Sequence, residues 1–264
     1  MSDTQFFGRK AREWIVAAGN LVMKGREESY RFTMKEKTNP VTEIDIRCEQ
    51  FLKAKILSQF PDHNILAEES APIENTSEVT WIIDPIDGTT NFLHNFPYFC
   101  ISIAIQTKAG VIAGVIYDPL RQELFYSDAE TEGTILNDKP VHVTTTKKVQ
   151  DSLLVTGFPY KHDEIFYQNF KRFQRMYERS HGVRRSGAAA LDLAYVASGR
   201  SDGYWEFTLK PWDCAAGAYL VMKAGGHVTT VEGQNYSPYI PSLLASNGYI
   251  HAEMIEILNL NNNT

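Results

Sequence analysis

The sequence contains little cysteine, and its three cysteines lie far apart. Cys48, Cys100 and Cys214 are odd in number and form no CxxC pair, so neither a disulfide framework nor a cysteine metal or redox site is predicted. The sequence also lacks any run of about 18 apolar residues, which a membrane-spanning helix requires. Its first residues, MSDTQFFGRKAREW, carry charge where a signal peptide is apolar, so we expect a cytoplasmic protein without a membrane partner.

A block of basic residues is missing as well. The net charge of −6 is spread over both halves of the chain, which argues against nonspecific nucleic-acid binding through phosphates. If the substrate is anionic, something other than surplus lysine must neutralise it. With 264 residues and 43% hydrophobic content, the chain suits one large domain or two closely packed subdomains.

The first half of the sequence predicts two helices followed by a sheet. Apolar residues three and four positions apart predict helices from about Gln5 to Glu28 and from Thr42 to Gln59, the second capped by Thr42 with Asp45. The polar stretch between them, Lys35 to Asn39, is expected to be a loop. From His63 to His142, short segments rich in β-branched and aromatic residues indicate mainly antiparallel strands.

The second half alternates strands with helices, which is typical of an α/β arrangement. The predicted helices run near Asp163 to Arg179, Gly187 to Ala197 and Pro211 to Lys223, between strands such as SLLVTGFP, GYWEF and LLASN. The polar segment TTTKKVQD interrupts the pattern. We therefore expect an N-terminal α+β subdomain over residues 1–146 and a C-terminal α/β subdomain over residues 147–264.

The stretch WIIDPIDGTTNF places two carboxylates after an apolar strand. We expect the strand to end at Asp84, because Pro85 cannot donate to the ladder. Asp87 lies three residues on, and two such carboxylates remain ionised in a partly buried place only with a cation between them. Magnesium suits oxygen ligands, and the amides from Gly88 onward could bind an anion if a helix begins there. The alternative is a solvated DxxDG turn.

Two further segments end in acidic residues. NILAEES is strand-like and finishes with Glu68 and Glu69, and PWDCAAG places Asp213 in the first turn of a helix. Alone, Asp213 would be interpreted as a helix cap. Carboxylates at the ends of several elements in both halves instead favour a shared oxygen-ligand site.

WIIDPIDGTTNF, AEES and WDCAAG, in this order and spacing, resemble the signature motifs of the inositol monophosphatase family. The resemblance extends from Val41 to Gly226. It implies a layered αβαβα sandwich of the fructose-1,6-bisphosphatase-like type, mixed α+β and α/β. It also implies lithium-sensitive, magnesium-dependent hydrolysis of small phosphate monoesters, most readily myo-inositol 1-phosphate, and a homodimer.

The resemblance also implies roles for individual residues. The first metal ion would be held by Glu68, Asp84 and the carbonyl of Ile86, and the second by Asp84, Asp87 and Asp213. Glu68 would also help to hold a third ion. The Asp45 and Thr89 pair would orient and activate the attacking water. The remaining roles concern the substrate: the amides of Gly88 and Thr89 would bind its phosphate, and Gly187, Ala189, Glu206 and Asp213 would contact its alcohol.

Two positions depart from the family pattern. The segment KEKTNPVT offers Lys35 or Lys37 for the metal-binding loop and has Pro40 in place of an acidic residue. Ala188 replaces a hydroxyl residue that many members carry. Both changes concern substrate preference and leave the proposed metal ligands intact.

Alternative mechanisms, substrates and roles make different demands on the sequence. An aspartyl-phosphate mechanism of the DxDGT type needs a nucleophile where this chain has Pro85. Within the same fold, fructose 1,6-bisphosphate or the 2′-phosphate of NADP are alternative substrates, with Arg184 and Arg185 as candidate partners of a second phosphate. A protein-interaction role with a structural metal site is the alternative outside catalysis.

Overall fold

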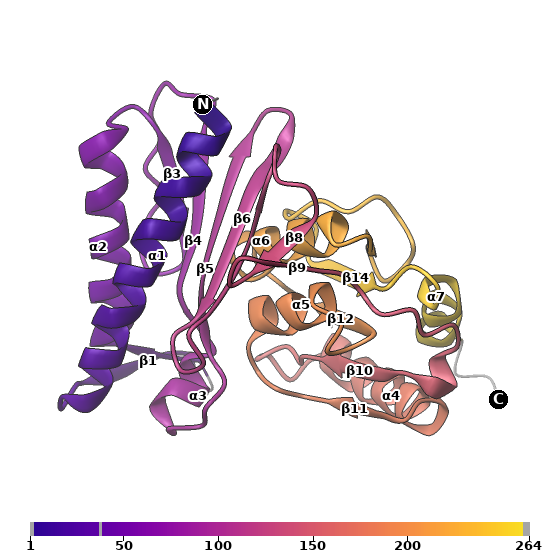
Figure 1. Ribbon diagram of the computed structural model, residues 1–264. Coiled ribbons are helices and arrows are strands. Elements are labelled where there is room, and N and C mark those ends of the chain that lie inside the picture. The colour runs from indigo at the N-terminus through magenta and orange to yellow at the C-terminus, as the bar shows by residue number, and fades with distance from the viewer. Residues whose placement is uncertain (1–2, 37–38, 261–264) are drawn as a thin grey trace.

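The computed structural model describes residues 3–36 and 39–260, which form five alternating layers of helices and sheets (Figure 1). The outer layer consists of α1 (Asp3–Glu27) and α2 (Glu43–Gln59), and the central layer of α5 (Ala189–Ala197) and α6 (Pro211–Lys223). The layer at the other end consists of α4 (Glu164–Arg179) and α7 (His251–Asn259). A sheet lies on each side of the central helices. The expected αβαβα sandwich is confirmed.

The first sheet has seven strands in chain order: β3 (Asn64–Ala67), β4 (Thr80–Asp87), β5 (Cys100–Thr107), β6 (Gly110–Asp118), β7 (Glu123–Asp128), β8 (Thr134–Leu136) and β9 (Lys139–Val141). Only its β3–β4 pair is parallel. The second sheet has the order β11 (Gly182–Arg184), β10 (Leu153–Thr156), β12 (Gly203–Phe207), β14 (Ser242–Ser246) and β13 (His227–Thr229). There β10 runs parallel to both of its neighbours. The sequence did not predict β8, β9 or α7.

Each layer contact has its own apolar core. Buried residues of α1 and α2 pack on one face of the first sheet, α5 and α6 fill the space between the two sheets, and α4 and α7 cover the second sheet. Helices between two sheets are apolar on all sides, as α5 and α6 are. Gly114 allows the close approach of β6 to α6, because a Cβ there would lie 2.8 Å from the carbonyl oxygen of Ala216.

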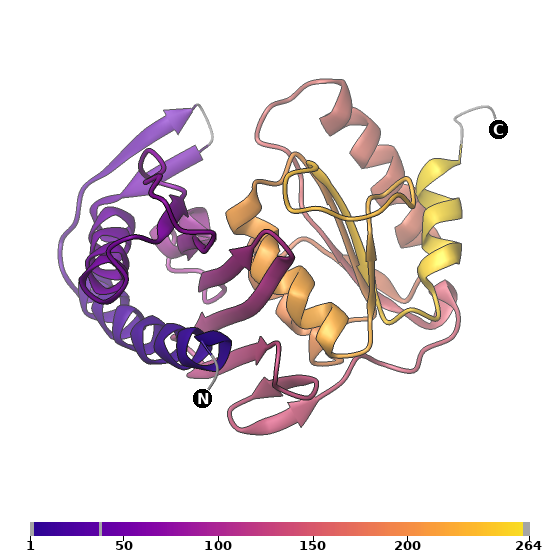
Figure 2. The same ribbon diagram turned by 90° about the horizontal axis from the view of Figure 1, so that it is seen from above.

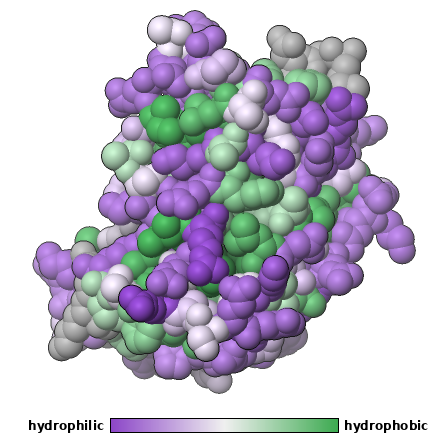
Figure 3. Space-filling view, turned by 90° about the vertical axis from the view of Figure 1, so that its left-hand side faces the viewer, coloured by the Kyte–Doolittle hydropathy of each residue, from purple (hydrophilic) through white to green (hydrophobic). Residues whose placement is uncertain are grey.

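The predicted loop at Lys35–Asn39 was wrong. Lys35 lies within a strand, β1 (Phe32–Glu36), that pairs antiparallel with β2 (Asn39–Thr42); Lys37 lies outside the described residues. The described side chains of β1 are exposed, including Phe32 and Met34, whereas Pro40, Val41 and Thr42 of β2 are buried. The polar residues at the tip therefore resemble a loop in sequence although they connect two paired strands. On the face that α1 and α2 cover, hydrophilic residues surround scattered apolar ones (Figure 3).

The segment that connects the two sheets, between β9 and β10, has no regular structure except for a short 3₁₀ helix at Val149–Asp151. The division into 1–146 and 147–264 stays a prediction. Seen from above, α6 lies between the two sheets (Figure 2). Among the described residues, none of the helices combines the length and apolar character that crossing a membrane requires.

Candidate active site

The strand β4 carries both acidic residues of the central motif, and it does not end at Asp84 as predicted. The strand continues to Asp87 after an irregularity: Asp84 pairs with Ser102 and Asp87 with Cys100, so β4 has one residue more than β5 in this interval. The bulge accommodates Pro85, which cannot donate to the ladder. Oδ1 of Asp84 accepts a hydrogen bond from the amide of Ile86 at 3.0 Å, which gives the bulge a tight turn.

Helix α2 orients Asp45 toward this turn. Thr42 caps the helix, and Asp45 at its third position accepts a hydrogen bond from the amide of Thr42 at 2.9 Å, so the predicted capping box is confirmed. The other carboxylate oxygen of Asp45 accepts a hydrogen bond from Oγ1 of Thr89 at 3.0 Å. The same hydroxyl lies 3.0 Å from the carbonyl oxygen of Ile86. Three residues with predicted roles therefore meet in one buried group.

Glu68 lies immediately after β3, beside the hairpin. Nζ of Lys35 donates to Oε1 of Glu68 at 2.8 Å and to Oε1 of Glu69 at 2.6 Å. The buried carboxylate of Glu49 accepts a hydrogen bond from the amide of Glu69 at 2.7 Å, and Ser70 donates to it as well. Lys35, one of the two lysines considered from sequence, therefore faces the acidic residues.

The second half of the chain contributes Asp213 and Glu206. Asp213 lies in the first turn of α6 and accepts a hydrogen bond from the amide of Lys210 at 2.7 Å, so the capping function and the site position coexist. Glu206, near the end of β12, accepts a hydrogen bond from the hydroxyl of Tyr204. Gly157 is necessary beside it, because a Cβ at this position would overlap the Glu206 carboxylate.

A small pocket connects the two halves. It is lined by Asp87, Gly157, Phe158, Tyr160, Arg185, Gly187, Ala188, Ala189, Glu206, Leu209 and Asp213. All the residues predicted for the alcohol of the substrate line it, whereas Asp45, Glu68, Asp84, Gly88 and Thr89 lie outside its lining. The structure thus separates an acidic cluster around Asp84 from the pocket that contains the residues predicted for the alcohol, with Asp87 and Asp213 adjoining both.

Burial and mutual repulsion act on the acidic residues. Burial first, and then the charges of Glu68, Asp87 and Asp213, raises the pKa of Asp84 well above its ordinary value. Burial also raises the pKa of Asp45 to about 6 and that of Asp87 to about 7. Carboxylates so arranged favour a bound cation, because a cation relieves the repulsion that raises these pKa values.

The donor set suits magnesium in its chemistry, since it consists of carboxylates and the carbonyl of Ile86. Within residues 3–36 and 39–260, however, no three acidic, histidine or cysteine side chains are already arranged as a metal cage. Among the acidic residues, Glu68 and Glu69 are paired with the ammonium group of Lys35. A cation bound by Glu68 would compete with its ion pair to Lys35.

The raised pKa values predict how stability depends on pH. Glu69 and Glu206 also have pKa values raised to about 7 by burial, compared with about 4 for carboxylates in an unfolded chain. The folded protein thus holds protons that the unfolded chain releases, so the free energy of unfolding falls as pH rises from about 5 to 8. We expect the unfolding midpoint in EDTA to fall over this range, and less so with magnesium. A midpoint that rises with pH in EDTA would contradict this.

Several residues of the site were not predicted from sequence. Asn91 donates from its side chain to backbone carbonyls of both halves, and Tyr98 donates to the buried carboxylate of Asp192 at 2.6 Å. Arg185 lines the pocket while Arg184 does not, although the sequence treats them alike. Asn91 belongs to the motif itself, so its position could have indicated a role; the others depend on contacts between distant segments.

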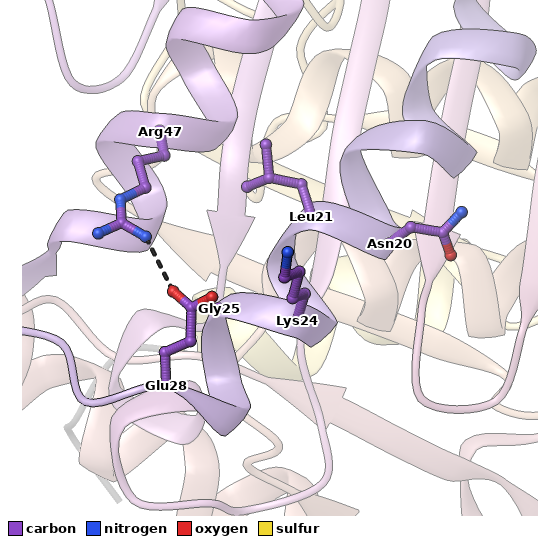
Figure 4. Close-up of a pocket in the computed structure, with 6 residues that line it drawn as sticks. All are labelled: Asn20, Leu21, Lys24, Gly25, Glu28 and Arg47. Carbon is purple, nitrogen blue, oxygen red and sulfur yellow. Dashed lines mark hydrogen bonds and ion pairs between the residues drawn. The ribbon is translucent and has the colours of Figure 1, made fainter.

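A second groove lies between α1 and α2, away from the acidic cluster (Figure 4). It is lined by Asn20, Leu21, Lys24, Gly25, Glu28 and Arg47, and Arg47 donates to Glu28 across it at 3.2 Å. None of the predicted site residues lies here.

Comparison with known proteins identifies the family. The model of the inositol monophosphatase family matches residues 5–262, and the chain belongs to this family. Inositol-1-monophosphatase of Synechocystis is 40% identical over 259 residues, covering 97% of this chain and 90% of that protein. Nus factor SuhB of Haemophilus influenzae is 40% identical over 241 residues, which cover 90% of each chain.

Solved structures agree with this assignment. The extragenic suppressor protein suhB from Bartonella henselae superposes with a TM-score of 0.91 at 34% identity, covering 95% of this chain and 97% of that one. Inositol monophosphatase from Anabaena gives a TM-score of 0.86 at 39% identity, covering 96% and 95%. The resemblance stated from the motifs is confirmed, and the family supports a phosphatase of the inositol monophosphatase and SuhB type.

Proposed function

We propose that the protein is a magnesium-dependent phosphatase for small phosphate monoesters, with myo-inositol 1-phosphate as its preferred substrate. The observation that carries the proposal is the hydrogen-bonded group of Asp45, Thr89 and the Ile86 carbonyl beside the acidic residues of β4. Glu68, Asp84 and the carbonyl of Ile86 would hold one ion, Asp84, Asp87 and Asp213 a second, and Glu68 would help to hold a third. When bound, such ions neutralise charge on the phosphate and the leaving alcohol and make water more acidic.

Thr89 and Asp45 position the nucleophile. The hydroxyl of Thr89 donates to Asp45, so a lone pair of the same oxygen is oriented to accept a hydrogen bond from the attacking water. Water forms the new bond to phosphorus as the bond to the alcohol oxygen breaks, and the products are inorganic phosphate and the protonated alcohol. No covalent intermediate is needed, because positioning and electrostatics suffice for this type of transfer.

The lining of the pocket supports the proposal of a polyol substrate. Glu206 points its carboxylate over Gly157 and uses one oxygen to accept from Tyr204, which leaves the other oxygen to accept from a substrate hydroxyl. Gly187 and Ala189 line the same pocket, and Gly88 with Thr89 would bind the phosphate through their amides. Ala188 adds no hydroxyl there, so recognition depends more strongly on Glu206.

Phosphate release tests the proposal directly. The purified protein would be assayed with myo-inositol 1-phosphate, fructose 1,6-bisphosphate, NADP and 3′-phosphoadenosine 5′-phosphate, in magnesium, in EDTA, and in magnesium with lithium. We expect magnesium-dependent, lithium-inhibited release, fastest from inositol 1-phosphate. No release from any substrate would contradict the catalytic proposal and favour a protein-interaction role. Relatives named Nus factor SuhB are the reason to consider that role.

The alternative of a bisphosphorylated substrate depends on Arg185. This exposed guanidinium lines the pocket near Glu206, whereas Arg184 lies near the carbonyl of its neighbour Val183. If a second phosphate binds here, Arg185→Ala should lower kcat/KM for fructose 1,6-bisphosphate by about tenfold, the size expected for a charged hydrogen bond. Arg184→Ala is the matched control. Equal effects of both variants on this substrate would exclude Arg185 as its phosphate ligand.

The proposal includes a cytoplasmic homodimer. The small phosphorylated substrate that it names is consistent with the family. Light scattering on the full chain measures the oligomeric state, and a monomer at micromolar concentration would contradict the dimer.

A further inference from the structure

Asn91 lies in the short helix α3 (Thr89–Leu93), two residues after the catalytic threonine. Its side-chain nitrogen lies 2.7 Å from the carbonyl oxygen of Tyr98, 2.9 Å from that of Ser186 and 3.4 Å from that of Gly187. The last two belong to the segment 185–189, which we call the substrate loop. One amide group therefore holds together two segments that are about a hundred residues apart in the sequence.

Asp87 holds the substrate loop from its other end. Its carboxylate oxygens accept hydrogen bonds from the amides of Ala189 at 3.2 Å and Ala190 at 2.6 Å. Asn91 thus donates to carbonyls at the start of the loop, while Asp87 accepts from amides at its end. The motif binds the loop with complementary groups on both sides.

Two glycines allow the segments to approach this closely. A Cβ on Gly88 would lie 3.2 Å from the carbonyl oxygen of Gly187, and both residues have positive φ values, of 96° and 89°. The two turns are therefore in van der Waals contact at the point where phosphate and alcohol of a substrate would meet. A small shift of the loop would displace the alcohol relative to the phosphate.

We propose that Asn91 is a positioning residue that sets the register between the phosphate-binding turn and the substrate loop. The inference rests on the proposed function and adds a residue that acts through the loop, without touching the substrate. The chemistry requires an amide: its two N–H groups face carbonyl oxygens, whereas an aspartate would present only acceptors to them. Asparagine is also a weak helix former, so its presence within α3 is explained by these contacts.

The test compares two substrates in the full-length protein. Inositol 1-phosphate uses the substrate loop for its hydroxyls, whereas p-nitrophenyl phosphate has no hydroxyl for the loop to bind. We expect Asn91→Ala to lower kcat/KM for inositol 1-phosphate by about tenfold or more, and that for p-nitrophenyl phosphate by less than about threefold. Asn91→Ser, which keeps one donor, should recover part of the difference.

Leu93→Ala is the matched control, because Leu93 lies on the same helix and bonds to neither segment through its side chain. It should affect both substrates to the same degree. Equal losses for both substrates in Asn91→Ala and Asn91→Ser would overturn the inference and leave the proposed function intact. If Asn91→Ala does not fold, the inference is tested with Asn91→Ser alone, by comparing its losses of kcat/KM for the two substrates. A wild-type protein that hydrolyses neither substrate would instead contradict the proposed function.

Discussion

Asp84→Asn should abolish phosphatase activity, with a decrease in kcat of about a thousandfold or more, because metal ions supply several kcal/mol of transition-state stabilisation. The fold should persist. Asp84 is 1% exposed, and its charged form is disfavoured by burial and by four neighbouring carboxylates. A neutral side chain of the same shape removes that repulsion, so we expect the unfolding midpoint in EDTA to stay the same or rise.

Measuring both the activity and the effect of magnesium on the unfolding midpoint shows whether the loss is due to the metal site. In the wild type, magnesium should raise the unfolding midpoint, since a ligand that binds only the folded state stabilises it. In Asp84→Asn that rise should be largely lost. Asp62→Asn, at an exposed position, is the control and should leave both activity and the magnesium response unchanged. An Asp84→Asn protein with more than about a tenth of wild-type turnover at saturating magnesium would show that Asp84 has been assigned incorrectly.

Thr89→Ala should lower kcat by about a hundredfold to ten-thousandfold, the range that positioned acid–base groups contribute. Its hydroxyl is buried between Asp45 and the Ile86 carbonyl, each 3.0 Å away, so no other side chain replaces it. Thr89→Ser retains the hydroxyl and should keep most of the activity. The measurement is kcat at saturating magnesium and inositol 1-phosphate, with unfolding midpoints to verify the fold.

A double variant distinguishes two residues that act together from two residues that act independently. If Thr89 acts with Asp45, then Asp45→Asn combined with Thr89→Ala should cost little more than either change alone. Effects that multiply would show independent roles. A Thr89→Ala protein with nearly wild-type kcat would remove the pair from the mechanism altogether.

The local elements were predictable because their signals lie within a few residues of sequence. The helix α1 buries Ala11, Trp14, Ile15, Ala18 and Val22, which are the spacings of one apolar face. Helix α2 begins at the predicted cap, Thr42 with Asp45, and α6 has Asp213 in its first turn as the sequence indicates. The errors occur where local signals are weak: the short hairpin β1–β2, and the bulge that lets β4 continue past Pro85.

By itself, the sequence determined most helices and strands, because periodicity and caps are local properties. Its motifs indicated the family and the acidic site residues, and the layered arrangement was implied by the family resemblance. Only the tertiary structure showed that Lys35 binds Glu68 and Glu69, and that Arg185 lines the pocket where Arg184 does not. It also decided that Asn91 joins the two halves. These contacts join segments brought together by the packing of two sheets around α5 and α6, and no local pattern encodes which side chains then meet.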